Sequence, residues 1–416
     1  MQDWMRQEGD SYRPLSNHPP ISLARFTVSE QPSEPISSAK LPEADPSEMT
    51  PGEQAEARRY GRISLTCSLA DSALDLAYLG VMTFVVATPL DKWLAEFPFL
   101  SGPCSYLRLI ALLLIVFTFH VMVSAPLSFF SGFVVEHWFG LSRQTRLRWL
   151  RNWSLNNGLA LAFSLILFVG LFAIIWNTGP YWWLVAAGAF FVVNVILGQA
   201  APVLIMPLFQ KIERLDDREI ESRMARLAEG TGLTIEGVYR LGLSADTSKA
   251  NAMLAGLGPT RRVLMGDTLL DQFSLDEIEV IFAHEIGHHV HRHISKMIAA
   301  GILWSLLGFW ICNWLIQWWP AGGFGPQVPT SALPLVMFTL LVFRLVLEPV
   351  QNFMSRHYER QSDQYALART GDRIAYRSAF TKLAKLNKAD TDPNPVEVFL
   401  FHSHPPIGQR LAIAAK

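Results

Sequence analysis

The sequence predicts a mainly helical, polytopic membrane protein with about six transmembrane helices and one small α+β domain. Hydrophobic residues make up 50% of the 416 residues and charged residues only 17%. Soluble domains carry about 25% charged residues, so this composition favours a lipid environment. Two long runs, residues 152–210 and 297–343, contain no charged residue at all. Each run is longer than the roughly 20 residues that one membrane crossing needs.

The first 63 residues are polar and contain several prolines, with no sustained apolar period. Such a segment cannot bury enough apolar surface to fold alone, so residues 1–63 are expected to form a disordered polar tail. The chain starts without a basic stretch followed by an apolar run. A cleavable signal peptide is therefore not expected, and insertion would depend on the first internal membrane segment.

Turn signals divide the two uncharged runs into separate helices. Residues 177–180 read Asn-Thr-Gly-Pro, and residues 320–329 are rich in glycine and proline. The predicted spans are residues 76–90, 109–127, 156–176, 181–207, 297–318 and 331–350. The predicted organisation is therefore the tail (1–63), a membrane domain of four helices (64–210), a small α+β domain (211–296), two further membrane helices (297–350) and a C-terminal region (351–416).

Basic residues orient these spans. Clusters of arginine and lysine precede the first span, separate the second from the third, and follow the fourth and the sixth. The positive-inside rule then places the N-terminus and both polar regions, 211–296 and 351–416, on the cytosolic side. A formal net charge of −1 gives no reason to expect a nucleic-acid partner. The cysteines, Cys67, Cys104 and Cys312, are too far apart in the chain to suggest a disulfide framework or a thiolate metal site.

A metal-binding pattern lies on a helix predicted from Leu275 to about His293. Ser274 and Glu277 form a capping box at its start. His284 and His288 are four residues apart, so both imidazoles lie on one face and can bind one Zn²⁺. Glu285 lies between them and can take a proton from a water molecule that the metal activates. The five-residue pattern also occurs by chance, for example on a solvated helix at the membrane boundary.

Three more histidines follow this pattern. His289 and His293 are expected to be exposed or to face lipid headgroups, since no carboxylate stands between them. His291 lies one turn beyond His288 and is an alternative third ligand. A ligand from a second helix would fix the geometry better.

The C-terminal region offers such a ligand. Glu359 and Asp363 are four apart on a predicted helix, so one carboxylate can bind the metal while the other orients a ligand histidine. The alternative interpretation is a charged helix face on which Arg356 and Arg360 are the partners of these carboxylates.

These motifs, taken together, resemble those of the type I CAAX prenyl proteases, which are membrane-embedded gluzincin metalloproteases. The resemblance covers about residues 66–416. The matching blocks, in chain order, are residues 136–145, 202–209, 249–252, 284–288, 352–363 and 404–410. A fold with a ring of helices around a large water-filled intramembrane chamber is what this resemblance implies. Such a chamber would accommodate the polar side chains of His120, Asn194 and Gln199 within spans.

The resemblance also implies roles for individual residues. His284, His288 and Glu359 would bind one zinc ion per chain, Glu285 would be the general base, and Asp363 would orient a histidine ligand. Substrate backbone would pair with Asn251 and with the strand edge Ala252, Met253 and Leu254. His404 and Arg410 would lie near the reacting carbonyl, where His404 could stabilise the oxyanion.

The function predicted on this basis is a zinc metalloendopeptidase that cleaves peptide or protein substrates, possibly prenylated, in CAAX-type C-terminal processing. Its site would lie on the cytosolic side of a bacterial inner membrane or an ER-type membrane. One alternative is a heat-shock-type membrane quality-control protease. A second alternative, of a different class, is a non-catalytic metal-binding membrane protein.

Overall fold

The computed structural model describes residues 48–102, 105–256, 261–319 and 325–415. Most of the predicted tail and Cys104 lie outside these described residues. Cys67 and Cys312 are both buried free thiols.

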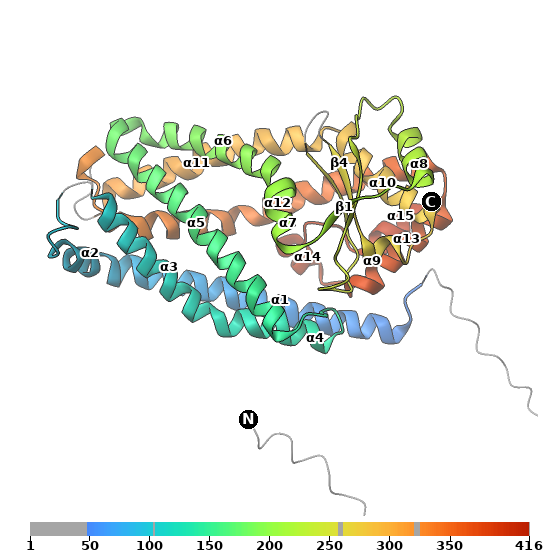
Figure 1. Ribbon diagram of the computed structural model, residues 1–416, viewed down its shortest axis with the longest axis horizontal. Coiled ribbons are helices and arrows are strands. Elements are labelled where there is room, and N and C mark those ends of the chain that lie inside the picture. Colours follow the sequence, from blue (N-terminus) through green and yellow to red (C-terminus); the bar gives the residue numbers. More distant parts are fainter. Residues whose placement is uncertain (1–47, 103–104, 257–260, 320–324, 416) are drawn as a thin grey trace, which may run out of the picture. The chain divides into compact units, whose positions relative to one another are not determined.

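Helices dominate the described residues (Figure 1). In chain order they are α1 (Pro51–Val81), α2 (Ala87–Ala95), α3 (Tyr106–Phe129), α4 (Glu136–Trp138), α5 (Arg146–Thr178), α6 (Trp182–Ala200), α7 (Met206–Phe209), α8 (Arg218–Ala228), α9 (Asp267–Leu270), α10 (Leu275–Val290), α11 (His293–Trp318), α12 (Ala332–Thr370), α13 (Arg373–Asn387), α14 (Pro395–Phe401) and α15 (Ile407–Ala414). The strands are β1 (Ile212–Arg214), β2 (Gly237–Leu241), β3 (Ala252–Ala255) and β4 (Arg262–Gly266).

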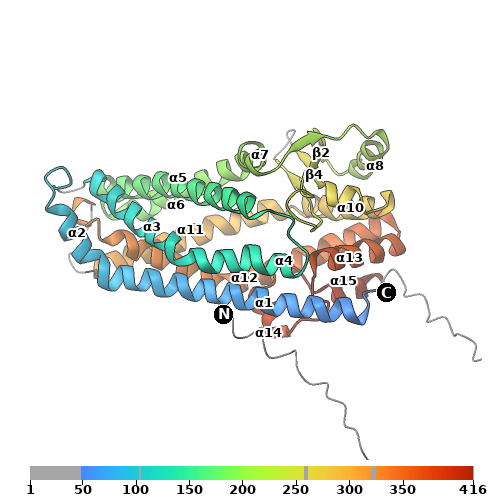
Figure 2. The ribbon, with the colours of Figure 1, turned by 60° about the horizontal axis from the view of Figure 1, so that its bottom comes forward.

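The long helices α1, α3, α5, α6, α11 and α12 lie side by side in both ribbon views (Figure 2). They pack in a closed order, α1 against α3, α3 against α5, α5 against α6, α6 against α11, α11 against α12, and α12 against α1. The helix arrangement therefore agrees with the ring that the sequence resemblance implied. The sheet and α10 lie at one end of these helices (Figure 1).

Five helical stretches of the described residues are long and apolar enough to cross a membrane. One of them, Arg146–Phe209, contains both α5 and α6, which a short turn at Gly179–Tyr181 separates. The weak predicted span 76–90 is part of a longer helical stretch, Pro51–Ala95. A multi-pass membrane protein is confirmed, while the count of six crossings stays a prediction.

The two ends of the helix bundle differ in the described residues. A large apolar cluster joins the end of α5, the start of α6, the end of α11 and the start of α12, and includes Phe172, Trp182 and Phe309. At the opposite end, next to α10, there is a cavity of about 1050 Å³. Its walls come from one face of α1, the middle of α12 and the polar C-terminal region. His120, Asn194 and Gln199 are not among the described residues that line this cavity, so the reason proposed for their polarity stays a prediction.

Two of these polar side chains are satisfied locally. The Nε2 atom of His120 on α3 lies 2.7 Å from an Asp75 carboxylate oxygen on α1. Asn194 donates to the carbonyl of Phe190 in its own helix at 2.8 Å. Hydrogen bonding inside the helix layer therefore lowers the cost of placing these polar side chains in the membrane. Arg344 and Glu348, four residues apart on α12, form an ion pair at 3.3 Å.

The four strands form one sheet in the order β1-β2-β4-β3. β2 and β4 are parallel, and the other pairs are antiparallel. From the sequence alone, short strands are expected at residues 237–243, 251–257 and 263–265. β2, β3 and β4 lie at these places, whereas β1 was not expected. β3 lies at an edge of the sheet, so one of its sides has no strand partner among the described residues.

The start of α10 agrees with the sequence pattern. The Ser274 hydroxyl accepts from the backbone N–H of Glu277, and the Glu277 carboxylate accepts from the N–H of Ser274 at 2.7 Å. Phe273 and Ile278 belong to the same apolar cluster, which also includes one face of α8. The capping box and this packing fix where α10 begins, and therefore where its histidines lie.

The boundary of the predicted tail at residue 63 lies inside α1. This helix begins at Pro51, behind a capping box formed by Thr50 and Glu53. Its first turns pack on α13, where Lys388 pairs with Glu56 at 2.6 Å. Residues 51–63 are thus helical because a distant helix supplies the partner surface that the segment lacks on its own.

Candidate metal centre

α10 and α12 approach each other closely at Gly287. A Cβ atom at this position would lie 2.8 Å from Ser362 Cα and 3.1 Å from Ser362 Cβ. Real Cβ atoms do not approach a backbone carbon so closely, so only glycine fits here. The missing side chain makes room for α12 itself and brings Glu359 and Asp363 next to the histidines of α10.

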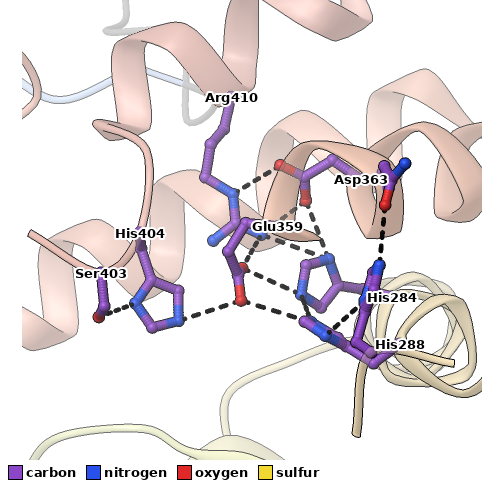
Figure 3. Close-up of polar contacts among 9 residues, drawn as sticks. His284, His288, Glu359, Asp363, Ser403, His404 and Arg410 are labelled. Carbon is purple, nitrogen blue, oxygen red and sulfur yellow. Dashed lines mark hydrogen bonds and ion pairs between the residues drawn. The ribbon is translucent and has the colours of Figure 1, made fainter. Parts of the chain in front are cut away.

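His284, His288 and Glu359 point toward one another across this contact (Figure 3). His284 Nε2 lies 3.3 Å from Glu359 Oε2, and His288 Nε2 lies 3.4 Å from Glu359 Oε1. The two Nε2 atoms are 3.2 Å apart. One potential ligand atom from each of the three residues lies within 4.8 Å of the others. Tertiary contacts therefore bring together the three metal ligands that the sequence proposed.

This arrangement fits a zinc ion. Zinc–ligand bonds of about 2.0–2.1 Å at tetrahedral angles place ligand atoms about 3.3 Å apart. The observed separations of 3.2–3.4 Å match that requirement. Glu359 is only 5% exposed, and its Oε2 atom accepts no hydrogen bond. A buried carboxylate oxygen without a donor is costly unless a cation compensates it.

Asp363 and Arg410 hold His284 from the side opposite the proposed metal position. Asp363 Oδ1 accepts from His284 Nδ1 at 2.9 Å, which leaves Nε2 facing Glu359. Arg410 in turn donates to both oxygens of Asp363, at 2.9 and 2.6 Å. Burial by itself lowers the pKa of His284, but the neighbouring carboxylates of Asp363 and Glu359 outweigh it and raise the pKa to about 9. The carboxylates thus create a negative potential that favours a cation.

Arg410 is buried beside Phe380, and its predicted role near a reacting carbonyl stays a prediction. Its side chain is 8% exposed and its guanidinium carbon lies 4.0 Å from the centre of the Phe380 ring. Asp363 raises the pKa of Arg410 against the opposing effect of burial, so the pair stays charged. The contact that the structure assigns to Arg410 is therefore with Asp363, and its Nη2 atom is 3.7 Å from Glu359 Oε2.

Glu285 lies beside the histidine pair on α10 and lines the cavity. Burial raises the pKa of its carboxyl above the ordinary value of 4.5, while the positive charge of neighbouring histidines and a backbone N–H bond from Leu254 oppose this effect. A carboxyl with a raised pKa is a better proton acceptor than an exposed one. The bond to Leu254 also places the proton acceptor against β3.

The β3 edge lies within reach of this site. Asn251 and Ala252 line the same cavity as His284 and Glu285, and Met253 and Leu254 continue the edge strand. Asn387 at the end of α13 fixes the start of this segment through two bonds. It accepts from the N–H of Ala250 at 3.0 Å and donates to the Ala250 carbonyl at 3.2 Å. Sequence reasoning gave no role to Asn387, because its partner lies 137 residues away.

His404 approaches the centre from a separate segment. Its Nε2 atom lies 3.4 Å from Glu359 Oε1, and its side chain is 62% exposed to the cavity. Arg356 on α12 holds the preceding chain by donating to the carbonyls of Val398 and His402, at 2.7 and 2.5 Å. Asn352, one turn earlier, donates to the carbonyl of Leu400 at 2.7 Å.

Arg356 is therefore not a partner of Glu359 or Asp363, and the alternative interpretation of a solvated charged face is wrong. Asn352, Arg356, Glu359 and Asp363 recur at helical spacing and are all buried. That spacing was visible in the sequence and could have indicated one shared, buried helix face.

The histidines after the motif have different environments. His289 accepts from Arg261 at 2.7 Å and is partly exposed. His293 is only 1% exposed, so the expectation that it faces headgroups is wrong. Its Nδ1 atom lies 3.1 Å from Nδ1 of His288. His291 does not belong to the group of three potential ligands found among the described residues.

Comparison with known proteins agrees with this geometry. Residues 214–416 match peptidase family M48, and residues 35–211 match the CAAX prenyl protease N-terminal family, described as five membrane helices. The chain is 27% identical to an uncharacterized metalloprotease, YhfN, of Bacillus subtilis, over 90% of this chain and 88% of that protein. It is 28% identical to CAAX prenyl protease 1 of Saccharomyces cerevisiae, over 70% of this chain and 68% of the yeast protein.

A solved structure has the same fold. The crystal structure of S. mikatae Ste24p aligns with a TM-score of 0.76 and 24% identity. The alignment covers 91% of this chain and 92% of that one. The shared fold therefore includes both the helix ring and the sheet domain.

Proposed function

Since this chain belongs to the CAAX prenyl protease family of M48 peptidases and is a membrane metalloprotease, we propose that it uses one zinc ion held by His284, His288 and Glu359. The observation that carries the proposal is the approach of these three side chains, at 3.2–3.4 Å, around a buried carboxylate oxygen without a donor. The match to a peptidase family excludes the alternative of a non-catalytic metal-binding protein.

The protein side chains would divide the work of hydrolysis among them. When bound, zinc lowers the pKa of a water molecule in the site and polarises the substrate carbonyl. Glu285 takes the proton from the attacking water and delivers it to the leaving amine. The exposed edge of β3 holds the substrate main chain in an extended form, at Asn251 and Ala252–Leu254. His404 donates a hydrogen bond to the developing oxyanion.

The cavity supports a peptide substrate. Its volume of about 1050 Å³ is at the upper limit of the roughly 300–1,000 Å³ of small-molecule pockets, and the edge strand β3 contributes Ala252 to its wall. Because relatives are named CAAX prenyl proteases, we propose C-terminal processing of prenylated proteins as the activity. Faster cleavage of a prenylated peptide than of its unmodified form would support this assignment. Equal cleavage of both would favour membrane quality control instead.

The basic clusters favour a site on the cytosolic side. They lie in the N-terminal half of α1, around the start of α5, after α7 and in the C-terminal half of α12. A reporter fused after residue 416 should be active only on the cytosolic face. Activity on the opposite face would reject this orientation.

Replacing Glu285 with glutamine tests the mechanism. The variant should retain one zinc ion per chain and lose peptide cleavage by about 100-fold or more, because the proton acceptor is removed. Glu279→Gln is the matched control, since Glu279 is on the same helix and pairs with Arg223, away from the site. Zinc content is measured by metal analysis and cleavage with a peptide library. Undiminished cleavage by Glu285→Gln would exclude this role.

A further inference from the structure

A second buried histidine lies directly behind His288. His293 Nδ1 is 3.1 Å from His288 Nδ1, and His293 Nε2 is 2.9 Å from Oε1 of Gln361. The His293 ring stacks on Tyr358, with centroids 4.4 Å apart and planes at 18°. Side chains from α10, α11 and α12 thus form one continuous row, from His288 through His293 to Gln361.

The backbone is bent to make this contact. Residues five apart on an uninterrupted helix point about 140° away from each other around the axis, so His288 and His293 would diverge. Here α10 ends at Val290 and α11 begins at His293, with Arg292 between them at φ = 54°. This left-handed conformation is uncommon for a residue other than glycine and costs energy. The break turns His293 back onto His288.

The donor and acceptor roles in this row depend on one another. Metal binding through Nε2 of His288 requires a lone pair there, so the proton of a neutral ring is on Nδ1. That N–H donates to Nδ1 of His293, which must then carry a lone pair. The proton of His293 is consequently on Nε2, where it donates to the amide oxygen of Gln361. Every member of the row is satisfied by a single arrangement of protons.

We propose that His293 is a positioning residue which, with Gln361, holds His288 in the tautomer and orientation that presents Nε2 to the metal. Asp363 does the same for His284, so each histidine ligand has its own partner. The two partners differ in charge, because Asp363 is a carboxylate paired with Arg410 and His293 is a neutral ring backed by an amide. Outer partners of this kind change metal affinity by about 10–100-fold when they are removed. The proposal rests on the metal centre proposed above.

The test uses the full-length protein in detergent or lipid nanodiscs. His293→Phe retains a ring that can stack on Tyr358 but removes both nitrogen atoms. Gln361→Leu removes the acceptor and leaves His293 in place, so it decides the question if His293→Phe does not fold. Both variants should bind zinc about 10–100-fold more weakly in competition with a chelator. Their cobalt-loaded forms should show a shifted visible absorption spectrum, while circular dichroism of the metal-stripped protein should show that both variants remain folded.

Two further variants make the result specific. Gln361→Glu keeps an acceptor for His293 Nε2–H and should restore zinc retention. His357→Gln changes an exposed histidine on α12 and should have no effect. Zinc affinity within twofold of the unsubstituted protein in both His293→Phe and Gln361→Leu, with an unaltered cobalt spectrum, would overturn the inference alone. Failure of the unsubstituted protein to bind zinc would overturn the metal centre as well.

Discussion

Replacing Gly287 with alanine tests whether the approach of α10 to α12 controls metal binding. The new Cβ atom would meet Ser362 Cα at 2.8 Å, whereas carbon atoms prefer separations of about 3.5–4.0 Å. The two helices must therefore separate locally by about 0.7 Å, the difference between 2.8 Å and the lower of those limits. Ser362 is adjacent in sequence to Asp363 and three residues from Glu359, so the shift reaches both carboxylates.

A displacement of this size exceeds what a metal site tolerates. Ligand distances in working sites stay within about 0.2 Å of their standard values. Zinc affinity of Gly287→Ala should therefore fall by about tenfold or more, and overpacking should lower the free energy of unfolding by about 1–3 kcal/mol. Zinc affinity is measured by chelator competition and stability by thermal unfolding of the metal-stripped protein.

Gly301→Ala provides the matched control. Gly301 is also helical, but no atom outside its own helix lies within 4 Å of its Cβ position. Alanine there should leave zinc affinity unchanged and should not lower stability. If Gly287→Ala bound zinc as tightly as the unsubstituted protein and unfolded at the same temperature, the close approach would have no role in the site.

Substitutions at three other positions address separate features. Arg292→Gly should retain or raise stability, because glycine adopts positive φ freely. Arg292→Val should lower the free energy of unfolding by about 1–3 kcal/mol, as measured by thermal unfolding. Equal stability of both variants would contradict the backbone strain. Arg356→Leu should lower kcat/KM by about tenfold or more with zinc content unchanged, because Arg356 no longer binds the carbonyls of Val398 and His402 that precede His404. An unaltered kcat/KM would refute this positioning role. Burial opposes ionisation of Glu277, but its bonds to Lys382 and neighbouring groups outweigh burial and lower its pKa below 4.5. The ionised Glu277 therefore stabilises the folded protein above about pH 4.5. This contribution is lost as the pH falls through the lower pKa of the folded state. The stability difference between the unsubstituted protein and Glu277→Gln, measured by denaturant unfolding, should shrink at acid pH, and a difference independent of pH would exclude this contribution.

Local patterns predicted the helix that carries the metal motif. Ser274 and Glu277 define its start through bonds between residues three apart, and the spacing of His284 and His288 follows from helical geometry alone. Membrane helices were also found from composition, because a run without charge needs no knowledge of its neighbours. β1 was missed because its three residues are too few to show an alternating pattern.

Where the sequence interpretation was wrong, a distant contact decided the outcome. His293 looked like a headgroup-facing residue, yet a backbone turn at Arg292 buries it against His288. Arg356 looked like a partner for neighbouring carboxylates, yet it binds carbonyls more than 40 residues further along the chain. α12 was divided at residue 350, although it continues as one helix through Glu359 and Asp363 to Thr370.

The sequence by itself determined the membrane helices, the capped helix that carries His284 and His288, and the family of this protein. Each of these depends on residue type and on spacing within one turn or one span. Only the tertiary structure decided which carboxylate faces the two histidines, which side chains hold them, and which residues line the cavity. Those features arise from packing between α10 and α12 and from bonds across more than 100 residues, and such contacts have no period that a single chain can display.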